Sequence, residues 1–191
     1  PQEDVMYYVT WSEGFRPGLL NRPVGSSNAD GSYTVKPEVD TDEITNFEFG
    51  WKTITKDGQL RFNGSAFYVD VTGLQSTIFD PSIVNLFFSD NAADATIKGV
   101  EGDFTYYTNV EGLSVAGAFS FLDTEITEKL VPTGDVIVGE ELAFAPGMQG
   151  NVRVRQEFGM AGGNLGHFQL QFTYSDDSYS DIMEPNKARQ A

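Results

Sequence analysis

The chain has 191 residues, of which 40% are hydrophobic, 13% aromatic and 21% charged, and this composition excludes disorder along the whole length. Twelve Lys and Arg against 28 Asp and Glu give a formal net charge of -16, which repels phosphate backbones and excludes nucleic acid as a partner. There is no cysteine, and therefore neither a disulfide nor a thiolate metal site.

Segments rich in aromatic and β-branched residues, bounded by turn formers, are predicted to be strands. In chain order they are Val5–Trp11, Thr45–Thr53, Leu60–Val71, Gly102–Thr108, Leu113–Asp123, a run around Val152, and His167–Ser175. No segment has a sustained apolar spacing of 3.6 residues, so helices are expected to be short or absent. The sequence therefore predicts an all-β fold, an antiparallel meander of about seven strands.

The connections between these strands alternate between short and long. Tight glycine-containing turns, in which glycine supplies a positive φ, are predicted at Lys56–Gln59, Asn109–Gly112 and Ala161–Asn164. The long polar stretches between them are Arg16–Asp42, Gln75–Asp94 and Glu128–Gly147. All tight turns then lie at one end of the sheet and all long loops at the other. This asymmetry is typical of transmembrane barrels, whereas long structureless loops are uncommon in compact soluble domains.

Apolar and polar residues alternate within the strands, so each strand has two different faces. In the first strand of this kind, apolar Phe47, Phe49 and Trp51 alternate with polar Asn46, Glu48 and Lys52. In the second, apolar Val152, Val154 and Phe158 alternate with polar Arg153, Arg155 and Glu157. In the third, apolar Phe168, Leu170, Phe172 and Tyr174 alternate with polar Gln169, Gln171 and Thr173. Polar groups are costly in hydrocarbon, so the apolar sets are predicted to face lipid and the polar sets a wet interior. A soluble sandwich or barrel shows the same period and is the alternative on alternation alone.

One predicted strand breaks this alternation. Leu60 and Phe62 share one face of the Leu60–Val71 segment, whereas Phe67, Val69 and Val71 share the other. A β-bulge near Gly64 and Ser65 would shift the register and restore the pattern. The sequence leaves the register at this point open.

Short motifs stand at the ends of several predicted strands. They are Gly14-Phe15-Arg16 before a long loop, Pro37-Glu38 before the next strand, Ile97-x-Gly99-Val100-Glu101, and Ala145-Pro146 before the Val152 run. In order and spacing they resemble the later barrel strands of TonB-dependent outer-membrane receptors. The resemblance covers nearly the whole chain and weakens after Ser175, where the sequence looks like the start of another external loop.

The resemblance implies that residues 1–191 are an open segment of a large transmembrane β-barrel, from its C-terminal region, with no plug domain. The family's barrel has about 22 strands around a plugged lumen, so two unpaired sheet edges are expected. The implied function is uptake across the bacterial outer membrane of a bulky nutrient, most often a ferric siderophore, with vitamin B12, haem and oligosaccharides as other family substrates. The implied partners are outer-membrane lipid and a TonB-type energising protein, which binds a region absent from this chain.

Residues in the predicted long loops are the candidate ligand contacts, because loops carry function on a rigid scaffold. The candidates are Arg16, Arg22, Tyr33, Phe79, Phe87 and Phe88. Loop residues that are merely solvated or packed on one another would look the same in a sequence.

No enzymatic activity, cofactor or metal site is predicted. His167, the one histidine, stands beside a tight turn, where a surface position is expected. Glu101 and Asp103 share a face, as a glycosidase pair does, but so do alternating lumen residues of a barrel. Asn28, Asp30 and Gly31 fit a turn without the glutamate of a calcium loop, although an acidic external loop leaves calcium open. The alternative function is a soluble all-β binding or adhesion module with acidic loops.

Overall fold

The computed structural model describes residues 4–21, 36–55, 57–79, 87–131 and 135–190. They form one large antiparallel sheet whose strands are β1 (Val5–Arg16), β4 (Asp42–Ile54), β5 (Leu60–Phe79), β6 (Phe87–Tyr107), β7 (Leu113–Lys129), β8 (Met148–Gly159) and β9 (Leu165–Ser175). Two small sheets are also present: β2 (Leu19–Leu20) pairs with β3 (Glu38–Val39), and β10 (Ser178–Tyr179) pairs with β11 (Arg189–Gln190). A short 3-10 helix, η1, spans Glu184–Asn186. Within these ranges no helix is long and apolar enough to cross a membrane.

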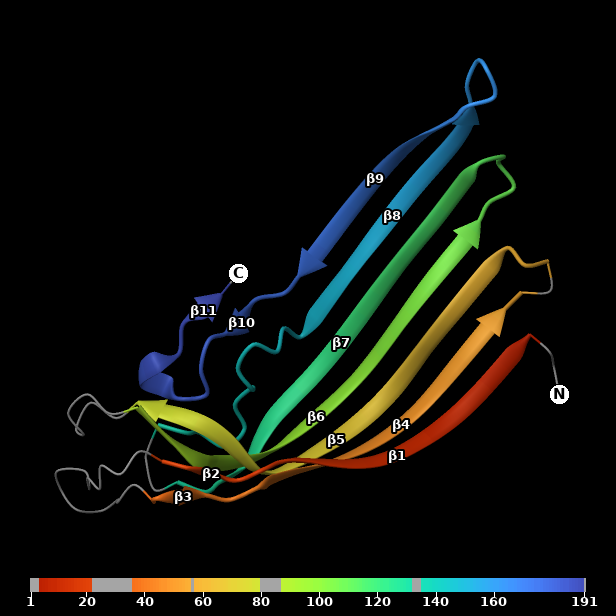
Figure 1. Cartoon of the computed structure of the whole chain (residues 1–191). Coiled ribbons are helices and arrows are strands. Elements are labelled where there is room, and N and C mark those ends of the chain that lie inside the picture. Colours follow the sequence, from red (N-terminus) through yellow and green to blue (C-terminus); the bar gives the residue numbers. More distant parts are fainter. Residues whose placement is uncertain (1–3, 22–35, 56, 80–86, 132–134, 191) are drawn as a thin grey trace.

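Each strand of the large sheet pairs with its sequence neighbours, in the order β1-β4-β5-β6-β7-β8-β9 (Figure 1). β1 and β9 are the two edges, and no pairing in the described part of the chain joins them, so the sheet stays open. The predicted meander of about seven strands is confirmed. A sandwich is excluded as the arrangement of these strands, because Phe47, Phe49 and Phe172 are 52%, 48% and 70% exposed and share no core.

The three predicted hairpin turns are confirmed. They connect β4 to β5, β6 to β7 and β8 to β9, and all three lie at the same end of the sheet (Figure 1). Gly58 and Gly112 adopt φ values of 71° and 74°, which residues with a Cβ adopt only at a cost. We call this end of the sheet the turn end and the opposite end the loop end.

The predicted loop Gln75–Asp94 is wrong over most of its length. β5 and β6 continue as a hairpin, pairing Gln75 with Asn91 and ending at the pair Phe79 and Phe87. We call this extension, Gln75–Phe79 with Phe87–Asn91, the ribbon. Its serines and its asparagine look like loop residues in the sequence. It is nevertheless held extended, because Ile78 and Phe88, which are direct partners, are buried in a cluster at the loop end.

The register near Gly64, which the sequence leaves open, contains no β-bulge in the pairing of β5 with β6. Pairing between β5 and β6 runs without interruption from Leu60 to Val71, and the irregularities lie beyond it, between Val71 and Gln75. Phe67, Val69 and Val71 therefore do lie on the same face as the polar residues nearer the turn end. Val71 is only 4% exposed, which shows that this face is covered as it approaches the loop end.

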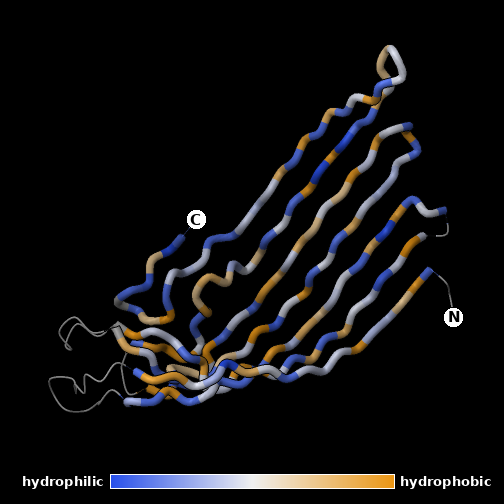
Figure 2. The backbone as a smooth tube through the Cα atoms, in the orientation of Figure 1, coloured by the Kyte–Doolittle hydropathy of each residue, from blue (hydrophilic) through white to orange (hydrophobic). Residues whose placement is uncertain are grey.

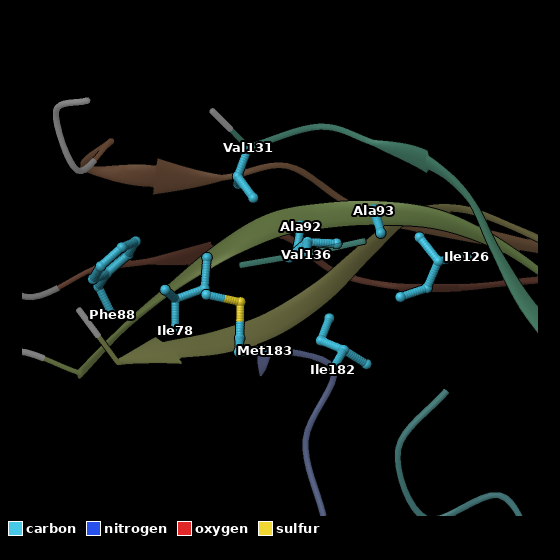
Figure 3. Close-up of a cluster of buried hydrophobic side chains, with 9 residues drawn as sticks. All are labelled: Ile78, Phe88, Ala92, Ala93, Ile126, Val131, Val136, Ile182 and Met183. Atoms are coloured by element: carbon cyan, nitrogen blue, oxygen red, sulfur yellow. The ribbon is translucent and has the colours of Figure 1, made fainter. Parts of the chain in front are cut away.

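The buried core is at the loop end rather than between two layers. Its side chains come from five separate parts of the chain (Figure 3), and they are Ile78, Phe88, Ala92, Ala93, Ile126, Val131, Val136, Ile182 and Met183. The segment after β9, which was expected to be the start of an external loop, contributes the last two. Along the rest of the sheet, apolar and polar residues alternate (Figure 2).

Candidate functional site

The pairing register collects most apolar side chains of the seven strands on one face of the sheet, with Phe67, Val69 and Val71 of β5 as exceptions. Directly paired residues of antiparallel strands point to the same side, so the pairs define rows across the sheet. Three successive rows are Val9, Phe49, Ala66, Val100, Phe121 and Met148; Tyr7, Trp51, Gly64, Gly102, Phe119, Gly150 and Tyr174; and Val5, Thr53, Phe62, Phe104, Gly117, Val152 and Phe172. We call this side the apolar face. The predicted separation of the two faces is confirmed.

The apolar face has the height of a bilayer core. On β7 every residue of this face from Leu113 to Phe121 is apolar, a length that matches the about 9–11 residues of a tilted membrane-crossing strand. Toward the loop end the composition changes abruptly, and the row Glu13, Thr45, Asp70, Thr96 and Glu125 is polar throughout. Trp11 and Tyr68 stand next to this boundary, where aromatic girdles lie in membrane barrels.

Aromatic rings lie against glycines of neighbouring strands on the apolar face. A Cβ added to Gly64 would lie 2.4 Å from the Trp51 ring, and one added to Gly102 would lie 2.8 Å from the Phe119 ring. A ring lying over a glycine restores the packing that the missing side chain forfeits, and it fixes the strand register. Aromatic rings therefore fill the apolar face even at the positions where a strand has glycine.

The opposite side, which we call the polar face, is hollowed over the middle strands. The hollow has a volume of about 680 Å³, and polar side chains of its lining include Lys52, Arg61, Asn63, Glu101, Asp103 and Asn151. Tyr8 donates a hydrogen bond of 2.6 Å to Glu48, and Asn63 donates to both oxygens of Asp103 at 3.1 and 3.2 Å. Cationic and anionic side chains are thus interleaved, which suits a water-filled passage.

The polar residues of β8 and β9 that are predicted to face a wet interior lie on this polar face. Arg153 and Arg155 pair with Gln171 and Gln169, and the guanidinium of Arg155 lies 2.8 Å from the carboxylate of Glu157. His167 pairs with Glu157 beside the β8–β9 turn and is exposed. In the described ranges, no group of three or more histidine, aspartate or glutamate side chains is arranged to hold a metal ion.

Four of the six predicted ligand contacts, Arg16, Phe79, Phe87 and Phe88, belong to described strands. Arg16, the last residue of β1, donates through Nε to Asp42 at 2.7 Å, with the carboxylate fully buried and the arginine side chain 52% exposed. Phe88 is 4% exposed in the loop-end core. Phe79 and Phe87 are the last pair of the ribbon. Arg22 and Tyr33 lie outside the described residues.

Phe144, in the connection between β7 and β8, is a candidate that the sequence reasoning missed. Its φ is 57°, a value that bulky residues rarely adopt, and its side chain is 66% exposed. The backbone is held there because the Phe144 N–H donates to the carbonyl of Tyr179 at 2.7 Å. Backbone strain of this kind occurs preferentially at functional sites. Only its position just before Ala145-Pro146 marks it in the sequence.

Asp42 joins three strands at the base of the loop end. Its carboxylate accepts hydrogen bonds from the side chain and N–H of Arg16 on β1 and from the N–H of Gln75 on β5 at 3.2 Å. Burial by itself raises the pKa of Asp42, but these hydrogen bonds outweigh it, and the pKa lies below its ordinary value. The ionised form is therefore the one that stabilises the junction.

This junction is expected to weaken only in acid. A lowered folded-state pKa means that the stabilisation is complete above the unfolded-state value of about 3.9 and is lost as the pH falls through the folded-state pKa. In the full-length protein, the melting temperature of the wild type should exceed that of Asp42→Asn by a constant margin from pH 7 to 5. The margin should shrink below pH 4, and a margin that stays constant down to pH 2.5 would contradict the assignment.

Comparisons with known proteins agree with this geometry. The family described as TonB dependent receptor-like, beta-barrel matches residues 1–189. The ferric yersiniabactin uptake receptor FyuA from Yersinia pestis superimposes with a TM-score of 0.70 at 16% identity, over 99% of this chain and 26% of that one. BauA, the ferric preacinetobactin receptor from Acinetobacter baumannii, has a TM-score of 0.67 at 19% identity with the same coverage. No curated protein sequence matches the chain.

Proposed function

We propose, since the chain belongs to the TonB-dependent receptor-like β-barrel family, that it forms part of an outer-membrane receptor for a ferric siderophore or a similarly bulky nutrient. The chain spans about a quarter of the length of the receptors with which it superimposes. The observation that carries the proposal is the open meander with one continuous apolar face and one hollowed polar face. Such a sheet suits a wall between lipid and a water-filled lumen.

The proposal assigns the whole of residues 1–191 to the barrel and its external loops. One sheet and its loop-end segments account for the described residues. A TonB-type energising protein then acts on another region of the full-length receptor, and outer-membrane lipid contacts the apolar face. In this arrangement the barrel is a transport wall with no enzymatic role.

The loop end is the proposed entrance for the ligand. Arg16 is half-exposed there and carries a positive charge, and the ribbon ends at Phe79 and Phe87. Arg22 and Tyr33 are proposed contacts on the same connection between β1 and β4. Phe88, which is buried, supports the ribbon rather than offering its own side chain. We add Phe144, whose exposed ring stands on a strained backbone.

The function can be tested by uptake. The full-length gene, expressed in a Gram-negative strain that lacks its own siderophore receptors, should restore growth under iron limitation with one class of ferric siderophore. Catecholate, hydroxamate and phenolate siderophores should be supplied separately, with haem and vitamin B12 as further substrates. Uptake should vanish when the strain's TonB is deleted. A full-length protein that folds without detergent and transports none of these would contradict the proposal.

A further inference from the structure

The ribbon has two sides that contact different segments of the loop end. Successive residues of a strand point to opposite sides. The direct partners Gln75 and Asn91 therefore point to one side, and the direct partners Ile78 and Phe88 to the other. The ribbon stands between the connection that joins β1 to β4 and the segments that follow β7 and β9.

The first side binds the β1–β4 connection through side-chain amides. Asn91 accepts a hydrogen bond from the Asp40 N–H at 2.8 Å and donates to the carbonyls of Asp40 at 2.9 Å and Gly73 at 2.6 Å. Gln75 donates to the carbonyls of Asp40 at 2.9 Å and Pro17 at 3.1 Å. Apart from the bond to Gly73 of β5, these amide bonds satisfy backbone groups of the β1–β4 connection, whose described residues include only the two short strands β2 and β3.

A third side-chain amide makes the same kind of contact in the opposite direction, from the connection to the ribbon. Asn21, in the β1–β4 connection, accepts a hydrogen bond from the Ser89 N–H at 2.9 Å and donates to the Ser89 carbonyl at 2.7 Å. Its side chain thus takes the place of a paired strand residue along the ribbon. Each of the two segments inserts an asparagine into the other, so neither can move away without breaking both sets of bonds.

The second side of the ribbon is buried by segments that follow β7 and β9. Ile78 is fully buried and Phe88 is 4% exposed, in a cluster with Val131, Val136 and Met183 (Figure 3). Val136 and Met183 form a backbone bridge, and the Glu184 N–H donates to the Asp135 carbonyl at 2.9 Å. The segment after β9 is therefore joined to the segment after β7 by backbone bonds as well as by the cluster.

A buried lysine ties these two segments together. The Lys187 side chain is 8% exposed, and its Nζ lies 2.6 Å from a carboxylate oxygen of Glu140 and 3.1 Å from one of Glu184. It also lies 4.2 Å from the centre of the Tyr179 ring. Burial alone lowers the pKa of Lys187, but the two carboxylates outweigh it and raise the pKa above its ordinary value. The lysine is therefore charged throughout the physiological range.

We infer that the ribbon couples residues 17–21 and 36–41 of the β1–β4 connection on one side to residues 135–147 and 178–187 on the other, so that these three described segments open and close as one unit. Packed and bonded segments share a single opening equilibrium, whereas independent loops open separately. The functional consequence, which rests on the proposed function, is that a ligand ordering one segment also orders the other two. The conformational entropy of the three segments is then lost in a single ordering step rather than in three separate ones.

Hydrogen exchange in the full-length receptor, folded in detergent micelles, tests the coupling. Asn91→Ala removes the three Asn91 amide bonds on the first side, and Met183→Ala opens a cavity on the second. Either change should raise amide exchange at least fivefold on both sides, at Asn21 and Asp40 and also at Glu184 and Phe144. Thr77→Ala is the matched control, because Thr77 is an exposed residue of the same ribbon, and it should change neither side.

The coupling is overturned if each change speeds exchange only on its own side of the ribbon. Asn21→Ala provides a milder variant if Asn91→Ala does not fold, since it leaves the three Asn91 bonds in place. It should still raise exchange at Glu184, and an unchanged Glu184 would contradict the inference. These measurements require no ligand, so they can fail while uptake succeeds, or succeed while no substrate is found.

Discussion

Replacing Phe49 by arginine is expected to destabilise the membrane-inserted barrel by about 2 to 4 kcal/mol, the range for a cation on the lipid face near the midplane. Phe49 lies in the Val9 row of the apolar face, is 48% exposed, and has the Tyr7 ring stacked on it with centroids 6.0 Å apart. An arginine there loses this contact and brings a charge into hydrocarbon. Urea unfolding of the full-length protein in lipid vesicles measures the difference.

The same amino acid placed on the polar face provides the control. Ala118 lines the hollow and pairs with Asp103, so an arginine introduced there meets water and a carboxylate. We expect Ala118→Arg to change the unfolding free energy by less than about 1 kcal/mol, as for an exposed ion pair. Removing a charge from that face by Arg153→Gln should be equally mild. If Phe49→Arg and Ala118→Arg cost the same, the assignment of the two faces is wrong.

Gly112→Ala is expected to be the most damaging of the single-methyl changes at the turns. Gly112 has a φ of 74°, and a Cβ added there would lie 2.3 Å from the backbone carbonyl oxygen of Glu157. That oxygen belongs to β8 and cannot rotate away as a side chain does. The cost therefore combines about 1 to 2 kcal/mol for the left-handed backbone with the cost of displacing a strand. Unfolding in vesicles should show a loss of about 3 kcal/mol, within the range for overpacked sites.

Gly58 separates these two contributions. Its φ of 71° is nearly the same, but a Cβ added there meets nothing within 4 Å. Gly58→Ala should therefore cost only the backbone part, about 1 to 2 kcal/mol. The difference between the two variants reports the contact with Glu157. Equal losses would show that β8 does not lie where the hydrogen bond from the Glu157 N–H to the Gly112 carbonyl places it.

Strand identity and the two faces could be predicted from the sequence because both depend on local features. A side chain on a strand points to the side set by its position, so the alternation of Phe47, Phe49 and Trp51 with Glu48 and Lys52 assigns faces without knowledge of the partners. Glycine at a turn likewise reports a local need for positive φ. These features placed the three hairpins at one end and, with the motifs at the strand ends, indicated the family.

The ligand-contact candidates depended on more than local features. Arg16 and Phe88 fall in polar stretches, which makes them loop candidates in the sequence, yet the structure gives the first a buried carboxylate partner and places the second in a core. Phe144 has no local pattern that distinguishes it, because its positive φ results from its hydrogen bond to Tyr179, distant in the chain. Contacts between distant segments leave no period in a sequence.

The sequence by itself determined the all-β class, the order of the strands, their two faces and the position of the turns, since each follows from residues close together in the chain. Only the tertiary structure decided that Gln75–Phe79 is strand rather than loop, that Phe67 and Val71 lie on the polar side without a bulge, and that the segment after β9 folds onto the loop end. The first and the last of these share one physical reason. Ile78, Phe88 and Met183 are buried by one another, and the free energy of burying apolar surface overrides the weak local preference of the polar residues between them.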